Sequence, residues 1–128
     1  MKQTEILLTI KLHQELFIDP KRVRLLKEIK ECGSINQAAK NAKVSYKSAW
    51  DPLEAMNKIS PKPLLERNIG GKNGGGTSLT TYAERLLQLY DLLEQTQEHA
   101  FHILQDETIP LNSLLSATAK FSLQSSAR

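Results

Sequence analysis

One stretch of the sequence decides the fold: SINQAAKNAKVSYKSAWDPLEAM, residues 34–56. Serine is a favoured helix N-cap, and Ser34 and Ser45 each precede apolar residues at helical spacing. The pattern therefore predicts two helices joined by a tight turn. Small side chains at Ala38 and Ala39 let the two helices cross closely at a steep angle. This combination is typical of a helix-turn-helix.

The start of the second predicted helix, the recognition helix, carries side chains that suit DNA. Residues 45–48 can all hydrogen bond, and Lys47 adds a positive charge. Such groups read base edges in the major groove, and the free N–H groups of a helix start attract phosphate. A helical hairpin that only packs within a protein is the alternative interpretation. We predict DNA contacts from Ser34, Gln37, Ser45, Tyr46, Lys47 and Ser48.

Two residues further along the recognition helix need a separate interpretation. Trp50 stands between apolar neighbours, so we interpret it as a packing residue rather than a base-stacking one. Pro52 has no N–H to donate to the carbonyl of Ser48. We therefore expect Pro52 to kink a helix that otherwise reaches about Lys58, or to end it early.

The residues before the helix-turn-helix predict a strand and another helix. Apolar residues alternate over about residues 4–12, and a period of two indicates a strand. Asp19 and Pro20 form a favoured helix start, and Gly33 is a favoured helix end. The basic residues of this helix are interpreted as a solvated face: Lys21, Arg22, Arg24 and Lys27.

A β-hairpin wing is predicted over residues 64–79. Two short strands, 64–68 and 77–79, flank a glycine-rich loop that contains Lys72 and Asn73. Glycine tolerates most backbone angles, so this loop can approach a DNA backbone closely. We assign Lys72, Asn73 and Arg67 to the DNA interface, although an exposed strand arginine is an equal interpretation for Arg67. The loop lacks the Lys-Ser/Thr pair of a nucleotide-binding P-loop.

The last predicted helix runs from Thr80 or Thr81 to about Leu104 and has a heptad pattern. It carries more apolar surface than one small domain can cover, so we predict a homodimer; a core helix of a monomer is the alternative. The predicted fold class is mainly α with a small β-sheet: a winged helix-turn-helix with a long C-terminal dimerisation helix. Residues 1–105 form this domain and residues 106–128 a linker. The predicted dimerisation residues are Leu79, Tyr82, Leu86, Leu89, Leu93 and Ile103.

Charge and composition limit the functions that are possible. Residues 1–78 hold 14 Lys/Arg and 8 Asp/Glu, a net +6, whereas residues 79–128 hold 3 and 6, a net −3. A basic front half favours a polyanionic partner. The sequence has no apolar run of about 20 residues, so we expect no membrane partner. The lone cysteine, Cys32, fits a reducing cytoplasm.

Catalytic and metal chemistry find little support in the sequence. No nucleophile–base pair is recognisable, so we do not expect an enzyme. His99 and His102 lie three residues apart near acidic residues, but a solvated helix surface explains them better than a metal site. A winged helix that assembles proteins without binding DNA is the alternative function.

Several blocks resemble the ModE family of bacterial molybdate-responsive regulators. The blocks are EILLT at residues 5–9, GSI at 33–35, SYKSAWD at 45–51, GGK at 70–72, GGG at 74–76, QLYDLL at 88–93 and PLNSLL at 110–115. The resemblance implies a winged helix related to the LysR-type arrangement, which binds double-stranded operator DNA as a homodimer. It further implies repression of molybdate import and activation of some molybdoenzyme genes. Pro52 departs from the expected family pattern.

The resemblance also implies a separate oxyanion-binding region in full-length members, where molybdate or tungstate binds. That region begins with a Ser-Ala-Arg motif whose Ser and Arg help to hold the oxyanion, and Ser126 and Arg128 match it at the end of this chain. An oxyanion needs several converging donors. We therefore expect no cofactor in this chain and no binding of molybdate by this chain alone.

Overall fold

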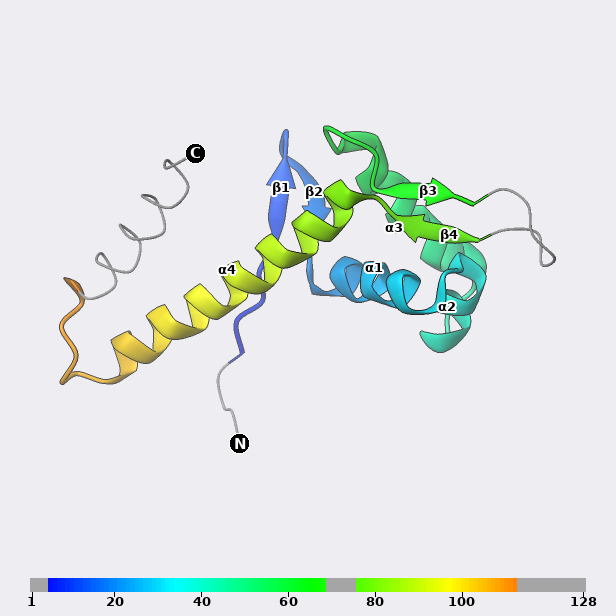
Figure 1. The fold of residues 1–128 in the computed structure, drawn as a ribbon. Helices are drawn as coiled ribbons and strands as arrows, with labels where there is room; N and C mark the ends of the chain where they lie inside the picture. The colour runs from blue at the N-terminus through cyan, green and yellow to red at the C-terminus, as the bar shows by residue number, and fades with distance from the viewer. Residues whose placement is uncertain (1–4, 69–75, 113–128) are drawn as a thin grey trace. The chain divides into compact units, whose positions relative to one another are not determined.

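The structure, a computed structural model, describes residues 5–68 and 76–112. Within them, the predicted helices and strands appear in the predicted order, with one further short strand, Glu15–Ile18, that the sequence did not predict (Figure 1). This confirms the predicted fold class, a helix-turn-helix followed by a β-hairpin and a long helix. The elements are β1 (Ile10–Leu12), β2 (Glu15–Ile18), α1 (Pro20–Cys32), α2 (Ile35–Asn41), α3 (Tyr46–Ile59), β3 (Leu65–Arg67), β4 (Thr77–Leu79) and α4 (Thr81–Gln105).

Side-chain caps fix the ends of the first three helices. Asp19, Ser34 and Ser45 each accept a hydrogen bond from the backbone N–H three residues later, at 2.8, 3.1 and 3.1 Å. Gly33 ends α1 with a φ of +70°, and its N–H donates to the carbonyl of Ile29. Only glycine adopts that backbone region without strain. The predicted starts of α1, α2 and α3 and the predicted end of α1 are confirmed.

The recognition helix α3 continues past Pro52 to Ile59, so the predicted early end is wrong. Its inward side buries Ala49, Leu53 and Met56, none of them more than 1% exposed. Each large apolar side chain contributes about 1.5–3 kcal/mol on burial, whereas an interior proline costs about 3 kcal/mol. Burial of the inward side therefore outweighs the missing hydrogen bond.

The N-terminal strand is shorter than predicted and has a partner that the sequence did not reveal. Strand β1 begins only at Ile10, and it pairs with β2 in antiparallel register, Leu12 opposite Glu15. The turn between them places His13 and Gln14 at φ of 52° and 68°. Two successive positive φ values match the tight turns that suit the twist of a hairpin. Strand pairing therefore stops at Ile10, opposite Ile18 at the end of β2, although the alternation of apolar residues extends further toward the N-terminus.

Apolar side chains from β2 and from helices α1, α2, α3 and α4 form the core of one compact unit, Leu7–Asp91. At the surface, salt bridges join α1 to α4: Lys27 to Asp91 at 3.1 Å and Lys30 to Glu84 at 3.4 Å. The first part of α4 is thus held against α1. The buried core residues are Phe17, Ile18, Val23, Leu25, Leu26, Ile29, Ile35, Ala38, Ala39, Ala49, Leu53, Met56, Leu64, Ala83, Leu86, Leu87 and Tyr90.

The wing hairpin consists of β3 and β4, and β4 contacts the end of α1. The two strands pair in antiparallel register, and the N–H of Thr77 donates to the carbonyl of Gly33 at 2.9 Å. A Cβ atom at Gly76 would collide with the same carbonyl oxygen of Gly33. Only a residue without a side chain fits between the wing and the end of α1. Residues 69–75, which include Lys72 and Asn73, lie outside the described residues.

We expect Gly76→Ala to lower the free energy of unfolding by about 1–3 kcal/mol, because backbone must move to admit the new methyl group. Urea denaturation measures the change. Gly33→Ala is the matched comparison: its Cβ has nothing within 4 Å, so only its positive φ costs stability, about 1 kcal/mol. A Gly76→Ala chain as stable as the wild type would contradict the tight contact.

A second unit contains residues 1–6 and 92–128, of which the structure describes residues 5–6 and 92–112. Helix α4 continues into it as far as Gln105. Beyond the helix, Asp106 accepts hydrogen bonds from the hydroxyl and the backbone N–H of Thr108, at 2.6 and 3.0 Å. These bonds lower the pKa of Asp106. The proposed boundary of the linker at residue 106 stays a prediction.

Within residues 5–68 and 76–112, no helix combines the length and the apolar character that crossing a membrane requires.

Candidate nucleic-acid interface

The start of the recognition helix presents polar groups to solvent, as the sequence predicts. Residues 45–48 are all exposed. The ammonium of Lys47 lies 2.9 Å from a carboxylate oxygen of Asp51, with the two side chains 82% and 55% exposed. Ion pairs this exposed contribute little, so Lys47 can leave Asp51 for another anion. The hydroxyl of Ser45 is occupied by capping and donates to Ser48 Oγ at 2.9 Å.

Tyr46, Trp50 and Arg67 form a stack that connects the recognition helix to the wing. The rings of Tyr46 and Trp50 have centroids 6.5 Å apart and planes 8° from parallel. The guanidinium carbon of Arg67, on β3, lies 5.8 Å from the centroid of the Trp50 ring. Trp50 Nε1–H donates to Glu54 at 3.0 Å, which fixes the indole. A cation over an aromatic face is attracted to it, so strand β3 and helix α3 hold each other in place.

Trp50 contacts other side chains of the protein on both sides, which fits its predicted role as a packing residue. Trp50 is half-buried against the core, and Tyr46 keeps 47% of its surface exposed. The spacing of Tyr46 and Trp50, one helical turn, was a signal available in the sequence. The position of Arg67 over Trp50 could not be predicted from the sequence, because it depends on how strand β3 packs against α3. Tyr46 thus stacks on Trp50 at the exposed end of the helix.

Of the other residues assigned to a site, some lie in the described part of the chain and four lie outside it. Ser34 is half-buried and its hydroxyl caps α2, whereas Gln37 is exposed and donates to Asn41 Oδ1 at 2.9 Å. Arg67 is exposed on the wing strand. Four assigned residues lie outside the described part of the chain: Lys72, Asn73, Ser126 and Arg128.

The basic residues of α1 are not one solvated face. Arg22 Nη1 donates to the backbone carbonyls of Leu16 and Phe17, at 2.8 and 3.2 Å, and so ties α1 to β2. Lys27 pairs with Asp91. Lys21, Arg24 and Lys27 are exposed, as predicted for a solvated face. The prediction missed the interactions of Arg22 and Lys27 because their partners come from other elements.

The structure also changes which side of α4 is free for a partner. Leu86 is 8% exposed within the core, so it is not available as predicted. Ile103, in the second unit, is 2% exposed, and its place in a dimer interface stays a prediction. Leu79 lies in strand β4 and, like Tyr82, packs against the core; Leu93 is half-buried. Leu89 is 45% exposed, and Leu92, which is not one of the predicted dimerisation residues, is 41% exposed. The domain covers the side of α4 that carries Ala83, Leu86, Leu87 and Tyr90.

In the part of the chain that the structure describes, no cluster of three or more His, Cys, Asp or Glu side chains is placed to hold a metal ion.

Comparison with known proteins identifies relatives along the whole chain. The chain is 88% identical over 128 residues to the transcriptional regulator ModE of Haemophilus influenzae. The match covers 100% of this chain and 50% of that protein. It is 59% identical over 127 residues to the DNA-binding transcriptional dual regulator ModE of Escherichia coli strain K12, covering 98% and 48%. The chain belongs to the ModE family of transcriptional regulators.

Further relatives agree with the ModE assignment. The transcriptional regulator ModE of Yersinia pestis is 59% identical over 126 residues, with 98% of this chain and 48% of that protein covered. No family sequence model matches the chain, so the ModE assignment rests on these individual relatives. The chain spans about half the length of the relatives it matches. The resemblance seen in blocks such as SYKSAWD is confirmed at the level of the ModE family, whose members named here are regulators rather than enzymes.

Proposed function

We propose that this chain binds double-stranded operator DNA as a homodimer and regulates genes of molybdate transport and molybdenum metabolism in the cytoplasm. One observation carries the DNA-binding part: the recognition helix begins with exposed Tyr46, Lys47 and Ser48, supported from the wing by Arg67 through Trp50. The names of the relatives support the regulatory part, and a relative from Azotobacter vinelandii is named a molybdenum transport protein.

The chemistry of the interface suits the reading of base sequence in a major groove. The amine of Lys47 donates to guanine O6 or N7, and the hydroxyl of Tyr46 donates to base or phosphate oxygens. The N–H groups at the start of α3 that Ser45 does not cap favour a phosphate. Lys72 and Asn73, in the wing loop, contact the flanking backbone in this proposal. Base contacts at α3 specify the site, and phosphate contacts at the wing position the domain.

A homodimer places two recognition helices on one operator. In this proposal, Leu89 and Leu92 of α4 meet the same residues of a second chain, because water-exposed leucines gain by burial. Two-fold symmetry of the protein then requires a roughly palindromic operator whose half-sites are separated by a fixed spacing.

For full-length relatives of this chain, we propose that molybdate or tungstate is the effector, with Ser126 and Arg128 among the groups that hold the oxyanion. A serine hydroxyl and a guanidinium are both donors suited to a tetrahedral dianion.

We expect Lys47→Ala to weaken binding to a specific operator about tenfold while binding to random duplex DNA changes less than about threefold, since base contacts carry about 1–3 kcal/mol of discrimination. Fluorescence anisotropy with both duplexes measures the two affinities. Lys58→Ala is the matched control, because Lys58 is an exposed lysine in the last turn of the same helix. Equal losses for the two variants would contradict base reading by Lys47.

A further inference from the structure

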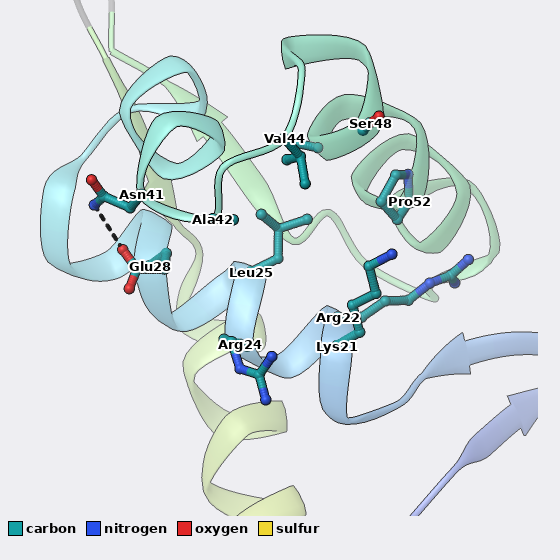
Figure 2. A pocket seen from close by; sticks show the side chains of 11 residues that line it. Lys21, Arg22, Arg24, Leu25, Glu28, Asn41, Ala42, Val44, Ser48 and Pro52 are labelled. Atoms are coloured by element: carbon teal, nitrogen blue, oxygen red, sulfur yellow. Dashed lines mark hydrogen bonds between the residues drawn. The ribbon is translucent and has the colours of Figure 1, made fainter.

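A cleft of about 200 Å³ opens between α1 and the turn that joins α2 to α3. Figure 2 shows Leu25 of α1 and Val44 of the turn facing each other across it, with Lys21 extending from α1 toward the α3 side. We call it the α1–α3 cleft. The residues that line it are Lys21, Arg22, Arg24, Leu25, Glu28, Asn41, Ala42, Val44, Ser48, Ala49 and Pro52.

The floor of the α1–α3 cleft is apolar and partly open to water. Val44 is 38% exposed although it is a large aliphatic residue, and Leu25 beneath it is 9% exposed. Ala42 and Pro52 complete the floor without polar side-chain atoms. The cleft is smaller than the roughly 300–1,000 Å³ of small-molecule pockets. A space of this size suits one apolar side chain of a partner, as anchors in protein interfaces do.

The rim of the α1–α3 cleft has opposite polarity at its two ends. Lys21 is exposed and, among the described residues, has no salt bridge or side-chain hydrogen bond. The guanidinium of Arg22 is held beside it by the Leu16 carbonyl at 2.8 Å, an interaction that leaves its charge intact. At the other end, Glu28 accepts from Asn41 Nδ2 at 2.9 Å. Arg24 points away from Pro52 (Figure 2). An acidic group is therefore attracted to one defined end of the cleft.

We propose that the α1–α3 cleft binds a protein segment that inserts one large apolar side chain between Leu25 and Val44 and places an acidic residue near Lys21 and Arg22. The apolar floor favours an apolar side chain of a peptide over a DNA backbone, which is anionic along its whole length. Lys47 is not among the lining residues. A protein bound here therefore meets the proposed DNA interface at Ser48 but leaves Lys47 free for DNA.

Selection from a displayed library of random short peptides on the full chain tests the proposal. Counter-selection uses Ala42→Leu, which fills the cleft from an exposed position. We expect enriched peptides to share a Leu, Phe or Trp close to Asp or Glu. Enriched peptides without this pair, or no enrichment relative to the filled variant, overturn the proposal.

The most enriched peptide is then titrated by fluorescence anisotropy against single-charge variants. We expect Lys21→Glu to weaken peptide binding about tenfold, whereas Lys62→Glu, the same charge change at an exposed lysine outside the cleft, leaves it within about twofold. An acidic residue in the first turn of α1 favours the helix dipole, so Lys21→Glu keeps the fold, which circular dichroism verifies. Equal effects of the two variants overturn the proposal.

A competition measurement with a random DNA duplex tests whether the cleft binds DNA instead of a peptide. If the duplex displaces the peptide, and Lys21→Glu weakens duplex binding as much as peptide binding, the rim is a contact for the DNA backbone and the proposal is overturned. The peptide titrations need no DNA, so a failure of this proposal and a failure of operator binding are observed separately.

Discussion

Replacement of both exposed leucines of α4, Leu89→Glu together with Leu92→Glu, is expected to convert a dimer into a monomer. The two side chains are 45% and 41% exposed, so in a single chain they lie at the surface and glutamate costs little there. Against a second chain, each glutamate replaces apolar contact by a charge that must lose water. The dissociation constant of the dimer should rise at least about a hundredfold, and sedimentation velocity measures it.

The conservative pair Leu89→Met with Leu92→Met is the control, because methionine keeps the apolar character and nearly the same volume. We expect it to remain dimeric. Circular dichroism of the glutamate variant should match the wild type, since the core side of α4 is unchanged. A glutamate variant that stays dimeric would remove Leu89 and Leu92 from the interface.

Trp50→Ala is expected to lower the preference for a specific operator about thirtyfold, more than the removal of Lys47 alone. Trp50 supports the ring of Tyr46 at 6.5 Å and holds Arg67 at 5.8 Å, so its loss releases a contact on the helix and a contact on the wing together. The loss of a base contact by Tyr46 corresponds to about 1–3 kcal/mol of discrimination, a range that includes a thirtyfold change. The ratio of anisotropy-derived affinities for operator and random duplex gives the preference.

Two further variants separate positioning from general damage to the fold. Trp50→Phe keeps a ring for both neighbours and should recover most of the preference, although it loses the hydrogen bond to Glu54. Arg67→Ala should cost less in the Trp50→Ala background than in the wild type, because the two residues act through one contact. Additive losses would show that the stack plays no part in recognition.

The chain contains a single tryptophan, so its fluorescence comes from the stack itself. A change in Trp50 emission during titration with operator DNA is expected if Arg67 or Tyr46 shifts toward the DNA.

Local chemistry explains which features could be predicted from the sequence. The caps at Asp19, Ser34, Ser45 and Gly33 satisfy backbone groups within a few residues, so residue type and position suffice to place them. The same holds for the exposed polar start of α3. Contacts between distant segments could not be placed in this way, as Arg67 over Trp50 illustrates.

The heptad of α4 shows a second limit. The pattern has two apolar sides, and the sequence does not say which of them the domain itself covers. The structure buries Leu86 and exposes Leu89 and Leu92, because Ala83, Leu87 and Tyr90 complete the side that meets the core. Pro52 shows a third limit, since the burial of Leu53 and Met56 overrides a local helix-breaking signal.

The central claim is that the chain reads DNA sequence through the start of α3. The most direct measurement titrates the chain into a labelled palindromic promoter fragment of a molybdate-transport operon and into a scrambled duplex, at several salt concentrations. We predict much tighter binding to the promoter fragment, with log affinity falling linearly with log salt for both duplexes. Equal affinity for the two duplexes, or no binding to either at low salt, would contradict the claim.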